Sequence, residues 1–568
     1  MIHTKNGLKR LKDVNWDEIS WKIIDKKISL LQQRIFKASR NGNKSNVKYL
    51  QSVLIKLPDA KLLAVRAAIT ENIEKHIDKI NKQKIITKCD KLKLTIKLKI
   101  DGKIGPIESI YTSDKVLIDS LLIPIILDQA KQILIKMALE PAWEAKFEPN
   151  SYGFRPGRNC HDAIISILNS VKSAIRPKWI LYVNLKSCYD NIDHNYLLKC
   201  LDESPIYIIK QIKAWLQAGI LQRYLPYNKD FENINFKNTI KSYILSNLLV
   251  NIALHGIEKH LKKWNLKLSE SNNFYKKYKE NYKSLNIIRY SNDIVITHYN
   301  KERIVEAKQE LKNWLNNTLK VLPNRIQIKF IKEGFDFLGF HIVSIYKNGK
   351  YITKIYPQKL SLKRIIRKAH NIIFSNKAAH VESLIIKLRP ILLSWANYFK
   401  FSECNKTFTK LDYIVWQMLR KWINRRSTGG RTQSWNKYFP GTYTKFDGKI
   451  YKDKYVLKSS KNINEKYYLP KIRWITSQKW VKVKSNSSPY DQNNIYWTKR
   501  NILYANLILK QSKLLIKQNF LCSKCGGKIS SWNKIKVYTF KKLSKSNFNK
   551  KNNKKILHRA CYIDFINN

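Results

Sequence analysis

Two apolar runs that flank Ser291 and Asn292 predict a β-hairpin in the stretch NIIRYSNDIVITH. Another apolar run, at 179–185, predicts a buried strand that continues into a polar loop. Helical periodicity, by contrast, governs 15–85 and the basic stretch from about 358 onward. Together these patterns predict an α+β chain with several domains.

The length of the chain also requires more than one core, because 568 residues exceed what a single hydrophobic core supports. The hydrophobic content of 44% is ample for packed domains. Further predicted elements are a turn at 41–43, short strands and loops at 86–118, a helix at about 130–140, an unpatterned insertion at 265–285, a strand pair in FIKEGFDFLGFHIV, a low-helix stretch at 427–500 and a helix at 501–518.

The chain is extremely basic, with 108 Lys and Arg against 41 Asp and Glu and a net charge of +67. A folded protein with this charge repels itself unless a polyanion neutralises it, so nucleic acid is the expected partner. AT-rich codon usage is the alternative source of lysine. It accounts for abundant Lys but not for scarce acidic residues.

Membrane attachment is a competing use of basic charge. The most apolar stretch, 243–258, is interrupted by Ser246, Asn247 and Asn251, and no run of about 20 apolar residues occurs. The first residues lack the apolar segment of a signal peptide and the composition of a transit peptide. We therefore expect no membrane partner, and we expect synthesis inside an organelle or, less favoured, in a bacterial cytoplasm.

Eight cysteines are present, and five of them are scattered singly, as is typical of reduced, buried thiols. The remaining three form two ligand pairs with a histidine: Cys522 with Cys525, and His558 with Cys561. Four such ligands in two pairs suit a tetrahedral structural zinc ion. Chance proximity of the two pairs in sequence is the alternative.

Several long motifs occur in order along the chain: LIKMALEPAWEAKFEPNSYGFRPGRNCHDAI, WILYVNLKSCYDNIDH, RYSNDIVI, FDFLGF and KLRPILLSWANYFKFSECNKTFTKLDYIVWQMLRKWINRR. This set resembles the group II intron-encoded protein family, which joins a reverse transcriptase, a maturase (X) domain and an HNH endonuclease. The resemblance implies a fingers and palm domain of the right-hand architecture, an α-helical thumb and a small zinc-stabilised ββα module. The implied domains are an N-terminal helical extension (1–85), fingers and palm (86–350), thumb/maturase domain (358–430), linker (431–500) and HNH-like module (501–568).

The chain departs from the family pattern at the metal ligands of the palm. The resemblance places three carboxylates at 184, 292 and 293, but the chain has Asn184, Asn292 and Asp293. Neutral amides cannot offset the charge of two Mg²⁺ ions and a triphosphate, so Mg²⁺ is not expected there. Two expected turns are altered as well, to Asp119-Ser120-Leu121-Leu122 and Ile240-Lys241-Ser242-Tyr243. Substitution of the missing ligands by Asp190 or Asp193 is the alternative.

The HNH resemblance is similarly incomplete. Where the family carries histidines, this chain has Tyr538, Thr539 and Tyr562. Without an imidazole to act as the general base that activates water, we expect no endonuclease activity. The zinc ligands Cys522, Cys525, His558 and Cys561 would then serve folding alone.

Basic residues in the matched blocks are the predicted RNA contacts, because Lys and Arg neutralise phosphates. Pro and Gly in SYGFRPGR are expected to hold the two loop arginines outward. Aromatic residues of the thumb are expected mainly in its helical core. The predicted contacts are Arg34, Lys61, Arg66, Arg155, Arg158, Lys387, Arg389, Lys400, Lys410, Arg420, Lys421, Arg425 and Arg426.

We therefore expect a non-enzymatic splicing factor that holds group II intron RNA in its active fold, located in an organelle and in a plastid rather than a mitochondrion. A general organellar RNA-binding protein is a variant of this hypothesis. An active retroelement reverse transcriptase with intron mobility is the main alternative, and a functionless relic is the third. A homodimer is compatible with the sequence.

Overall fold

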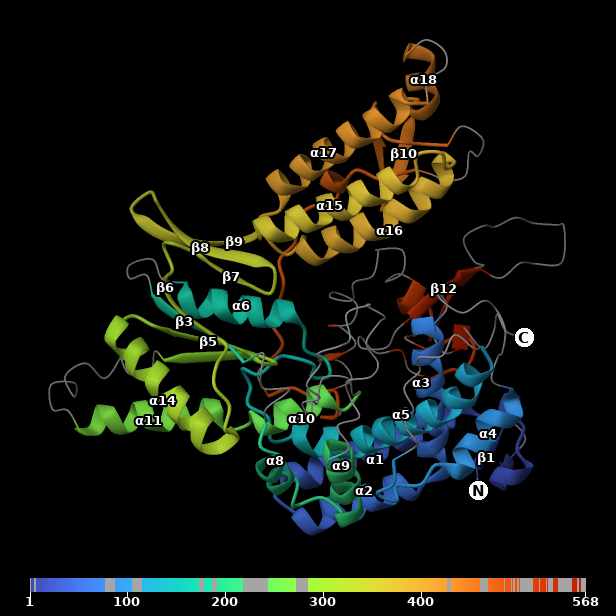
Figure 1. The fold of residues 1–568 in the computed structure, drawn as a ribbon, viewed down its shortest axis with the longest axis vertical. Coiled ribbons are helices and arrows are strands. Elements are labelled where there is room, and N and C mark those ends of the chain that lie inside the picture. Colours follow the sequence, from blue (N-terminus) through green and yellow to red (C-terminus); the bar gives the residue numbers. More distant parts are fainter. Residues whose placement is uncertain are drawn as a thin grey trace.

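The computed structural model of the protein has helices at its base, a sheet-containing middle and a helical bundle at the top (Figure 1). It describes residues 2–4, 7–76, 87–104, 115–172, 178–185, 192–217, 244–271, 285–426, 431–459, 468–484, 486–491, 493, 496–497, 500, 514–519, 521–527, 529, 535–539, 554–558 and 561–562. Among these residues, no helix is both long enough and apolar enough to span a membrane.

The N-terminal layer packs three consecutive helices against a longer one, and a further short helix packs against the third of them. Ile24, Ile28 and Ile35 are buried on one face of the first helix, as its period predicts, and Gly42 makes the predicted turn with φ +73°. The helices are α1 (Trp21–Arg40), α2 (Lys44–Lys56), α3 (Pro58–His76), α4 (Lys88–Lys97) and α5 (Lys115–Glu144), preceded by the short strands β1 (Ile2–Thr4) and β2 (Gly7–Lys9).

The prediction of short strands and loops at 86–118 is wrong for 88–97, which form a helix, whereas the described residues 98–104 form a loop as predicted. Thr87 and Asp90 form a reciprocal capping box that starts α4. Leu94 and Leu98, four residues apart, are then buried in the helical core. The helix predicted at about 130–140 also extends much further, as α5.

A four-stranded antiparallel sheet forms the middle of the molecule, with strand order β4-β5-β3-β6. Leu181 and Val183 enter the core shared with the N-terminal helices, whereas Ile180 enters a second core on the opposite face. The strands are β3 (Trp179–Asn184), β4 (Asn286–Tyr290), β5 (Asp293–His298) and β6 (Arg325–Phe330). The associated helices are α6 (Cys160–Val171), α8 (His194–Cys200), α9 (Ile206–Gln217), α10 (Ser246–Ala253), α11 (Ile257–Ser271) and α14 (Lys301–Leu319).

A second sheet leads from the middle of the molecule to the helical bundle. It contains β7 (Phe335–Phe337), β8 (Phe340–Lys347) and β9 (Lys350–Pro357), one strand more than the predicted pair. The bundle, which we call the thumb, contains α15 (Lys359–Ser375), α16 (Val381–Phe399) and α17 (Asn405–Asn424). Phe340 and Phe399 pack with ring centroids 4.9 Å apart and so join the thumb to the sheet.

The stretch 431–500, which composition predicts as a low-helix linker with some strands, does contain strands, and part of it also packs into the core of the thumb. It contains α18 (Arg431–Tyr438), β10 (Tyr443–Phe446), β11 (Lys449–Lys452) and a 3₁₀ turn at Ile472–Trp474. Its later part, which we call the return segment (described residues of 468–500), runs from the thumb back to the middle of the molecule. There Trp480 Nε1 donates to the buried carboxylate of Asp162 on α6 at 2.9 Å.

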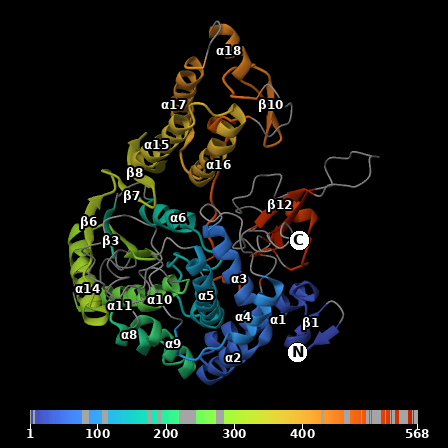
Figure 2. The same ribbon diagram turned by 45° about the vertical axis from the view of Figure 1, so that its right-hand side comes forward.

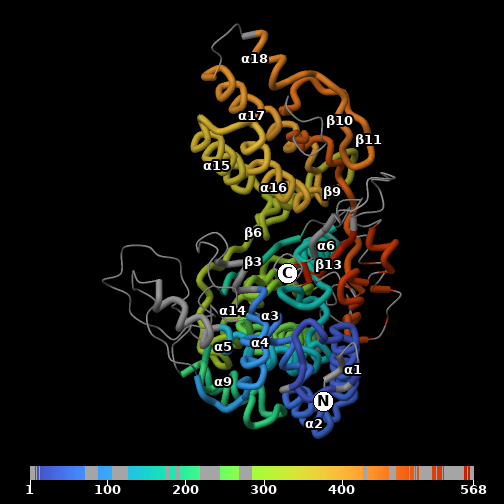
Figure 3. Tube along the Cα trace, turned by 90° about the vertical axis from the view of Figure 1, so that its right-hand side faces the viewer, coloured from blue at the N-terminus to red at the C-terminus, as the bar shows by residue number. Residues whose placement is uncertain are grey.

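The described C-terminal residues include a small antiparallel hairpin, β12 (Ile535–Thr539) and β13 (Lys554–His558). This hairpin lies beside the N-terminal helices rather than beside the thumb, as two further views show (Figures 2 and 3). Most of the helix predicted at 501–518 falls outside the described residues, and the helix of the predicted ββα module is not among the described elements.

Candidate nucleic-acid interface and metal centre

The sheet brings the predicted metal-ligand positions together. Asn184, the last residue of β3, pairs directly with Asp293, the first residue of β5. The amide Nδ2 of Asn184 donates to Asp293 Oδ1 at 2.6 Å, and the Tyr182 hydroxyl donates to the same oxygen at 2.7 Å. Burial and this hydrogen bond raise the pKa of Tyr182, so its hydroxyl stays a donor.

Asn292 lies in the turn between β4 and β5, beside Ser291, whose φ of +56° makes the turn tight. The backbone carbonyl of Asn292 accepts from Leu185 N at 2.9 Å. Gly153 packs on the same turn so closely that a Cβ there would lie 2.2 Å from Ser291 N. The hairpin is therefore held from two sides, and positions 184, 292 and 293 lie at one edge of the sheet.

These three positions supply one carboxylate instead of three. Its Oδ1 atom already accepts two hydrogen bonds from neutral donors, which compensate it without a cation. Two-metal chemistry needs anionic oxygens that hold two ions about 3.5–4 Å apart. Asn184, Asn292 and Asp293 do not form such a donor set.

The positions that could compensate are only partly described. Asp193 caps α8 through Asn195 N at 3.0 Å and contacts Lys320 at 3.3 Å, so its carboxylate already has partners. Asp190 and the altered turn at 240–243 lie outside the described residues. The other altered turn, 119–122, lies within α5.

Arg155 does not point outward, so the prediction for this loop arginine is wrong. Its guanidinium is buried and forms a forked pair with Glu144, with Nε–Oε1 at 2.7 Å and Nη2–Oε2 at 3.0 Å. Its Nη1 atom also donates to the carbonyls of Glu148 and Ser151. Arg155 thus joins the loop to α5 and presents no free face to a phosphate.

Substitution of Arg155 by lysine tests this structural role. Lysine keeps the charge but loses the fork, so the variant is expected to lose about 1–3 kcal/mol of unfolding free energy. The measurement is the urea midpoint by tryptophan fluorescence, with the exposed Arg34→Lys as the matched control. Equal midpoints for both variants and the wild type would contradict the assignment.

Arg158 borders a small polar hollow between this loop, α1 and the return segment. Its Nη1 atom donates to the Pro149 carbonyl at 2.8 Å, and burial together with neighbouring Arg155 lowers its pKa to about 10. It therefore remains charged at neutral pH. The hollow has a volume of about 200 Å³ and is lined by Phe36, Arg40, Glu144, Ala145, Phe147, Arg155, Arg158, Asn486, Ser487 and Ser488.

Five of the predicted thumb contacts are exposed as expected: Lys387, Lys410, Arg420, Lys421 and Arg425. On α17, the exposed Lys406, Lys410 and Arg420 lie along the same face as Tyr413, which is 57% exposed. Basic residues around an exposed ring suit a nucleic-acid surface, because the basic residues can bind phosphates while the ring stacks on an unpaired base. We call this set the α17 stripe.

Three other thumb contacts have structural partners. Lys400 is buried, and burial lowers its pKa, so the prediction that it contacts RNA is wrong for this conformation. Arg426 donates to the carbonyls of Lys377 and Ala379 at 2.9 and 2.7 Å. Arg389 is half-buried and stacks over Tyr468.

The N-terminal helices contribute one exposed predicted contact, Arg34 on α1. Lys61 on α3 is half-buried, and burial followed by neighbouring Lys99 lowers its pKa. Arg66, also on α3, is buried and faces Cys561 rather than solvent, so the prediction of an RNA contact is wrong there.

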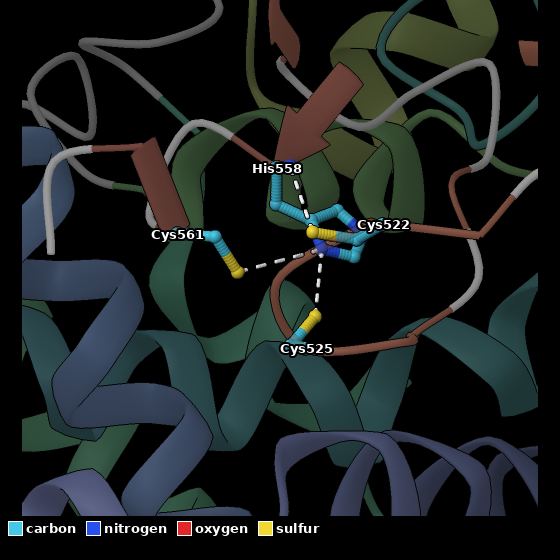
Figure 4. A group of neighbouring side chains, drawn as sticks. All are labelled: Cys522, Cys525, His558 and Cys561. Atoms are coloured by element: carbon cyan, nitrogen blue, oxygen red, sulfur yellow. Dashed lines mark hydrogen bonds between the residues drawn. The ribbon is translucent and has the colours of Figure 1, made fainter. Parts of the chain in front are cut away.

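The four predicted zinc ligands converge. One donor atom from each of Cys522, Cys525, His558 and Cys561 lies within 4.8 Å of the others, and this is the sole such group among the described residues (Figure 4). The backbone N–H of His558 points at Cys522 Sγ at 3.5 Å, and that of Gly527 points at Cys525 Sγ at 3.4 Å. Three sulfurs and one imidazole at this spacing fit a tetrahedral Zn²⁺ ion.

The positions expected for an endonuclease site are only partly visible. Tyr538 and Thr539 lie on β12 opposite Lys555 and Lys554, but their side chains are outside the described set. Tyr562 is half-buried beside Cys561.

Sequence reasoning missed several residues that shape the site. Tyr182 carries the second donor to Asp293, and its alternation along β3 from Asn184 was the available signal. Asp162 fixes the return segment, but its partners in that segment lie at separations of 318 to 338 residues. No local pattern reveals such a contact.

The segments that match known families correspond to the N-terminal helices, the sheet-containing middle and the thumb. Residues 16–98 match the N-terminal domain of reverse transcriptase, and residues 121–342 match the reverse transcriptase (RNA-dependent DNA polymerase) family. Residues 362–439, which include most of the thumb, match the group II intron, maturase-specific domain.

Several curated proteins are similar to this chain. Maturase-like protein 1 of Euglena gracilis is 26% identical over 405 residues, covering 69% of this chain and 79% of that protein. Group II intron-encoded protein LtrA of Lactococcus lactis subsp. cremoris is 34% identical over 139 residues, covering 24% of this chain and 22% of LtrA. The COX1/OXI3 intron 2 protein of Saccharomyces cerevisiae is 25% identical over 308 residues, covering 46% of this chain and 33% of that protein.

The sheet, its hairpin and the matched segments define a reverse-transcriptase-like protein with a helical thumb. Within that class, the chain carries a reverse transcriptase segment and a group II intron maturase-specific segment, and it is similar to curated maturase-like and group II intron-encoded proteins.

Proposed function

We propose that this protein is a maturase-like splicing factor that binds group II intron RNA and stabilises its catalytically active fold, without copying RNA into DNA. The intron RNA would carry out the transesterifications itself. The protein would contribute by binding the folded RNA more tightly than other conformations. The matched maturase-specific segment and the similar maturase-like proteins support this role.

The observation that carries the proposal is the loss of carboxylates at the expected metal-ligand positions of the palm. One carboxylate, Asp293, remains where three are needed, and Asn184 and Tyr182 satisfy its Oδ1 atom. The surfaces for RNA binding, by contrast, retain their charge: the α17 stripe and Arg34 are exposed. Loss of metal ligands together with retention of basic surface favours RNA binding over polymerisation.

Several finer assignments accompany this proposal. Zn²⁺ would occupy the Cys₃His cluster and supply folding free energy to an HNH-like module without a cutting site. We further propose an organellar location, a plastid before a mitochondrion, on composition alone.

A splicing assay tests the proposal. Precursor RNA containing the group II intron that hosts or neighbours the reading frame is incubated at limiting Mg²⁺ with and without purified protein. We expect spliced product to accumulate faster with the protein, because it lowers the free energy of the active RNA fold. An equal concentration of an unrelated basic protein controls for nonspecific charge. Splicing that is no faster than in this control would contradict the role.

A further inference from the structure

Arg66 connects three parts of the molecule that are remote in sequence. Its Nη2 atom donates to Cys561 Sγ at 2.8 Å, across a separation of 495 residues. Its guanidinium also stacks over the Trp21 ring on α1 at 4.3 Å. The side chain is 8% exposed. A buried arginine on α3 therefore contacts α1 on one side and a metal-ligand sulfur on the other.

The loop that carries the first ligand pair packs directly on α1. A Cβ on Gly527 would lie 2.6 Å from Asp25 Oδ2 and 3.3 Å from Cys525 Sγ. A Cβ on Gly526, which has φ +63°, would lie 3.0 Å from Lys22 Cδ. Two consecutive glycines thus allow backbone contact between the ligand loop and the helix. The Cys₃His cluster therefore lies at the interface with α1 and not on the solvent-exposed surface of the module.

The charge of Arg66 suits this position. Three thiolates around one Zn²⁺ ion carry a net negative charge, and a buried charge of this kind needs a nearby positive partner. Groups that donate hydrogen bonds to metal ligands orient those ligands and tune metal affinity. In this structure, the partner of Cys561 comes from the N-terminal helices rather than from the C-terminal module itself.

We propose that metal binding at the Cys₃His cluster fastens the C-terminal module to α1 and α3, and that Arg66 is the positioning residue that couples the ligands to this interface. With metal bound, Cys561 is fixed as an acceptor for Arg66, and the Cys525–Gly527 loop is fixed against α1. Loss of the metal frees both contacts together. The metal thereby rigidifies the N-terminal helices, although every ligand comes from the last part of the chain.

Hydrogen–deuterium exchange of the full-length protein tests the coupling. The zinc-loaded protein is compared with protein stripped by a chelator, with metal content confirmed by mass spectrometry. We expect faster exchange in peptides from α1 and α3 after stripping, and unchanged exchange in α16 and α17 of the thumb. The thumb serves as an internal check of folding. Unchanged exchange in α1 and α3 despite complete metal loss would overturn the proposal.

Two variants separate the role of Arg66 from a general effect of charge. Arg66→Gln is expected to weaken zinc binding by about 10–100-fold, as for other partners of metal ligands, and to speed exchange in α1. Lys37→Gln removes one positive charge from an exposed site on α1 and should change neither property. Zinc competition with a chromophoric chelator gives the affinities. Equal zinc affinity and exchange in the two variants would refute the role of Arg66.

A third variant covers the case in which Arg66→Gln disturbs packing beyond the interface. Arg66→Lys keeps the charge but loses the planar guanidinium that stacks on Trp21, so we expect an intermediate zinc affinity. An affinity as low as that of Arg66→Gln, with normal exchange in the thumb, would show that charge does not contribute and would contradict the electrostatic part of the proposal.

Discussion

Replacement of Asp162 by alanine is expected to cost about 3–5 kcal/mol of stability, because it removes the carboxylate that forms an ion pair with the buried Arg500 guanidinium. The Asp162 carboxylate is fully buried on α6. It accepts from Trp480 Nε1 at 2.9 Å, Val483 N at 2.8 Å and Arg500 Nη2 at 2.7 Å. These three donors attach the return segment to α6, and Tyr490 separately donates to Glu140 on α5 at 2.9 Å, so their loss is expected to loosen the segment around 480–483.

Limited proteolysis and urea unfolding measure this effect separately. The Asp162→Ala variant should show new cleavage within the return segment and a lower urea midpoint. Asp336→Ala is the matched control, since that carboxylate is exposed and contacts His341. A return segment that stays as protected in Asp162→Ala as in the control would contradict the assigned attachment.

Salt is expected to weaken RNA binding more than any single substitution does. A protein with a net charge of +67 that neutralises about 6–10 phosphates should lose about 10³–10⁵-fold in affinity between about 50 and 200 mM salt. The physical cause is the release of counterions from the RNA on binding, which added salt opposes. Filter binding or fluorescence anisotropy across a salt series gives the slope.

The same series locates the contacts. Lys410→Ala and Arg420→Ala, both on the α17 stripe, should each reduce the magnitude of the salt slope by about 1. Lys199→Ala removes an exposed charge on α8, outside the thumb, as the matched control. A slope near zero for the wild type would rule out phosphate contacts as the main source of affinity. Identical slopes for the stripe variants and the control would exclude the stripe.

Much of the fold was accessible from local pattern. The apolar runs of β3, β4 and β5 and the periodicity of α1 to α3 are signals within one element, and the structure confirms them. The helix α4 was missed because Leu92, Leu94 and Ile96 alternate like a strand. Its capping box and its packing against the helical layer decide the outcome.

For the candidate site, the sequence predicted the charges of the residues but not their burial. Arg155, Arg66 and Lys400 face remote partners or the core, and those contacts depend on tertiary packing. The convergence of Asn184 with Asp293 was predictable only because the resemblance assigns both to one site.

The central proposal is that this chain binds intron RNA through its exposed basic residues, while positions 184, 292 and 293 of the palm do not support polymerisation. The most direct test measures splicing and primer extension with the same purified preparation, on intron RNA and on a primed RNA template with deoxynucleotides and Mg²⁺. The account predicts accelerated splicing, with incorporation at background both in the wild type and in Asp293→Asn. Incorporation above background by the wild type that Asp293→Asn abolishes would contradict it.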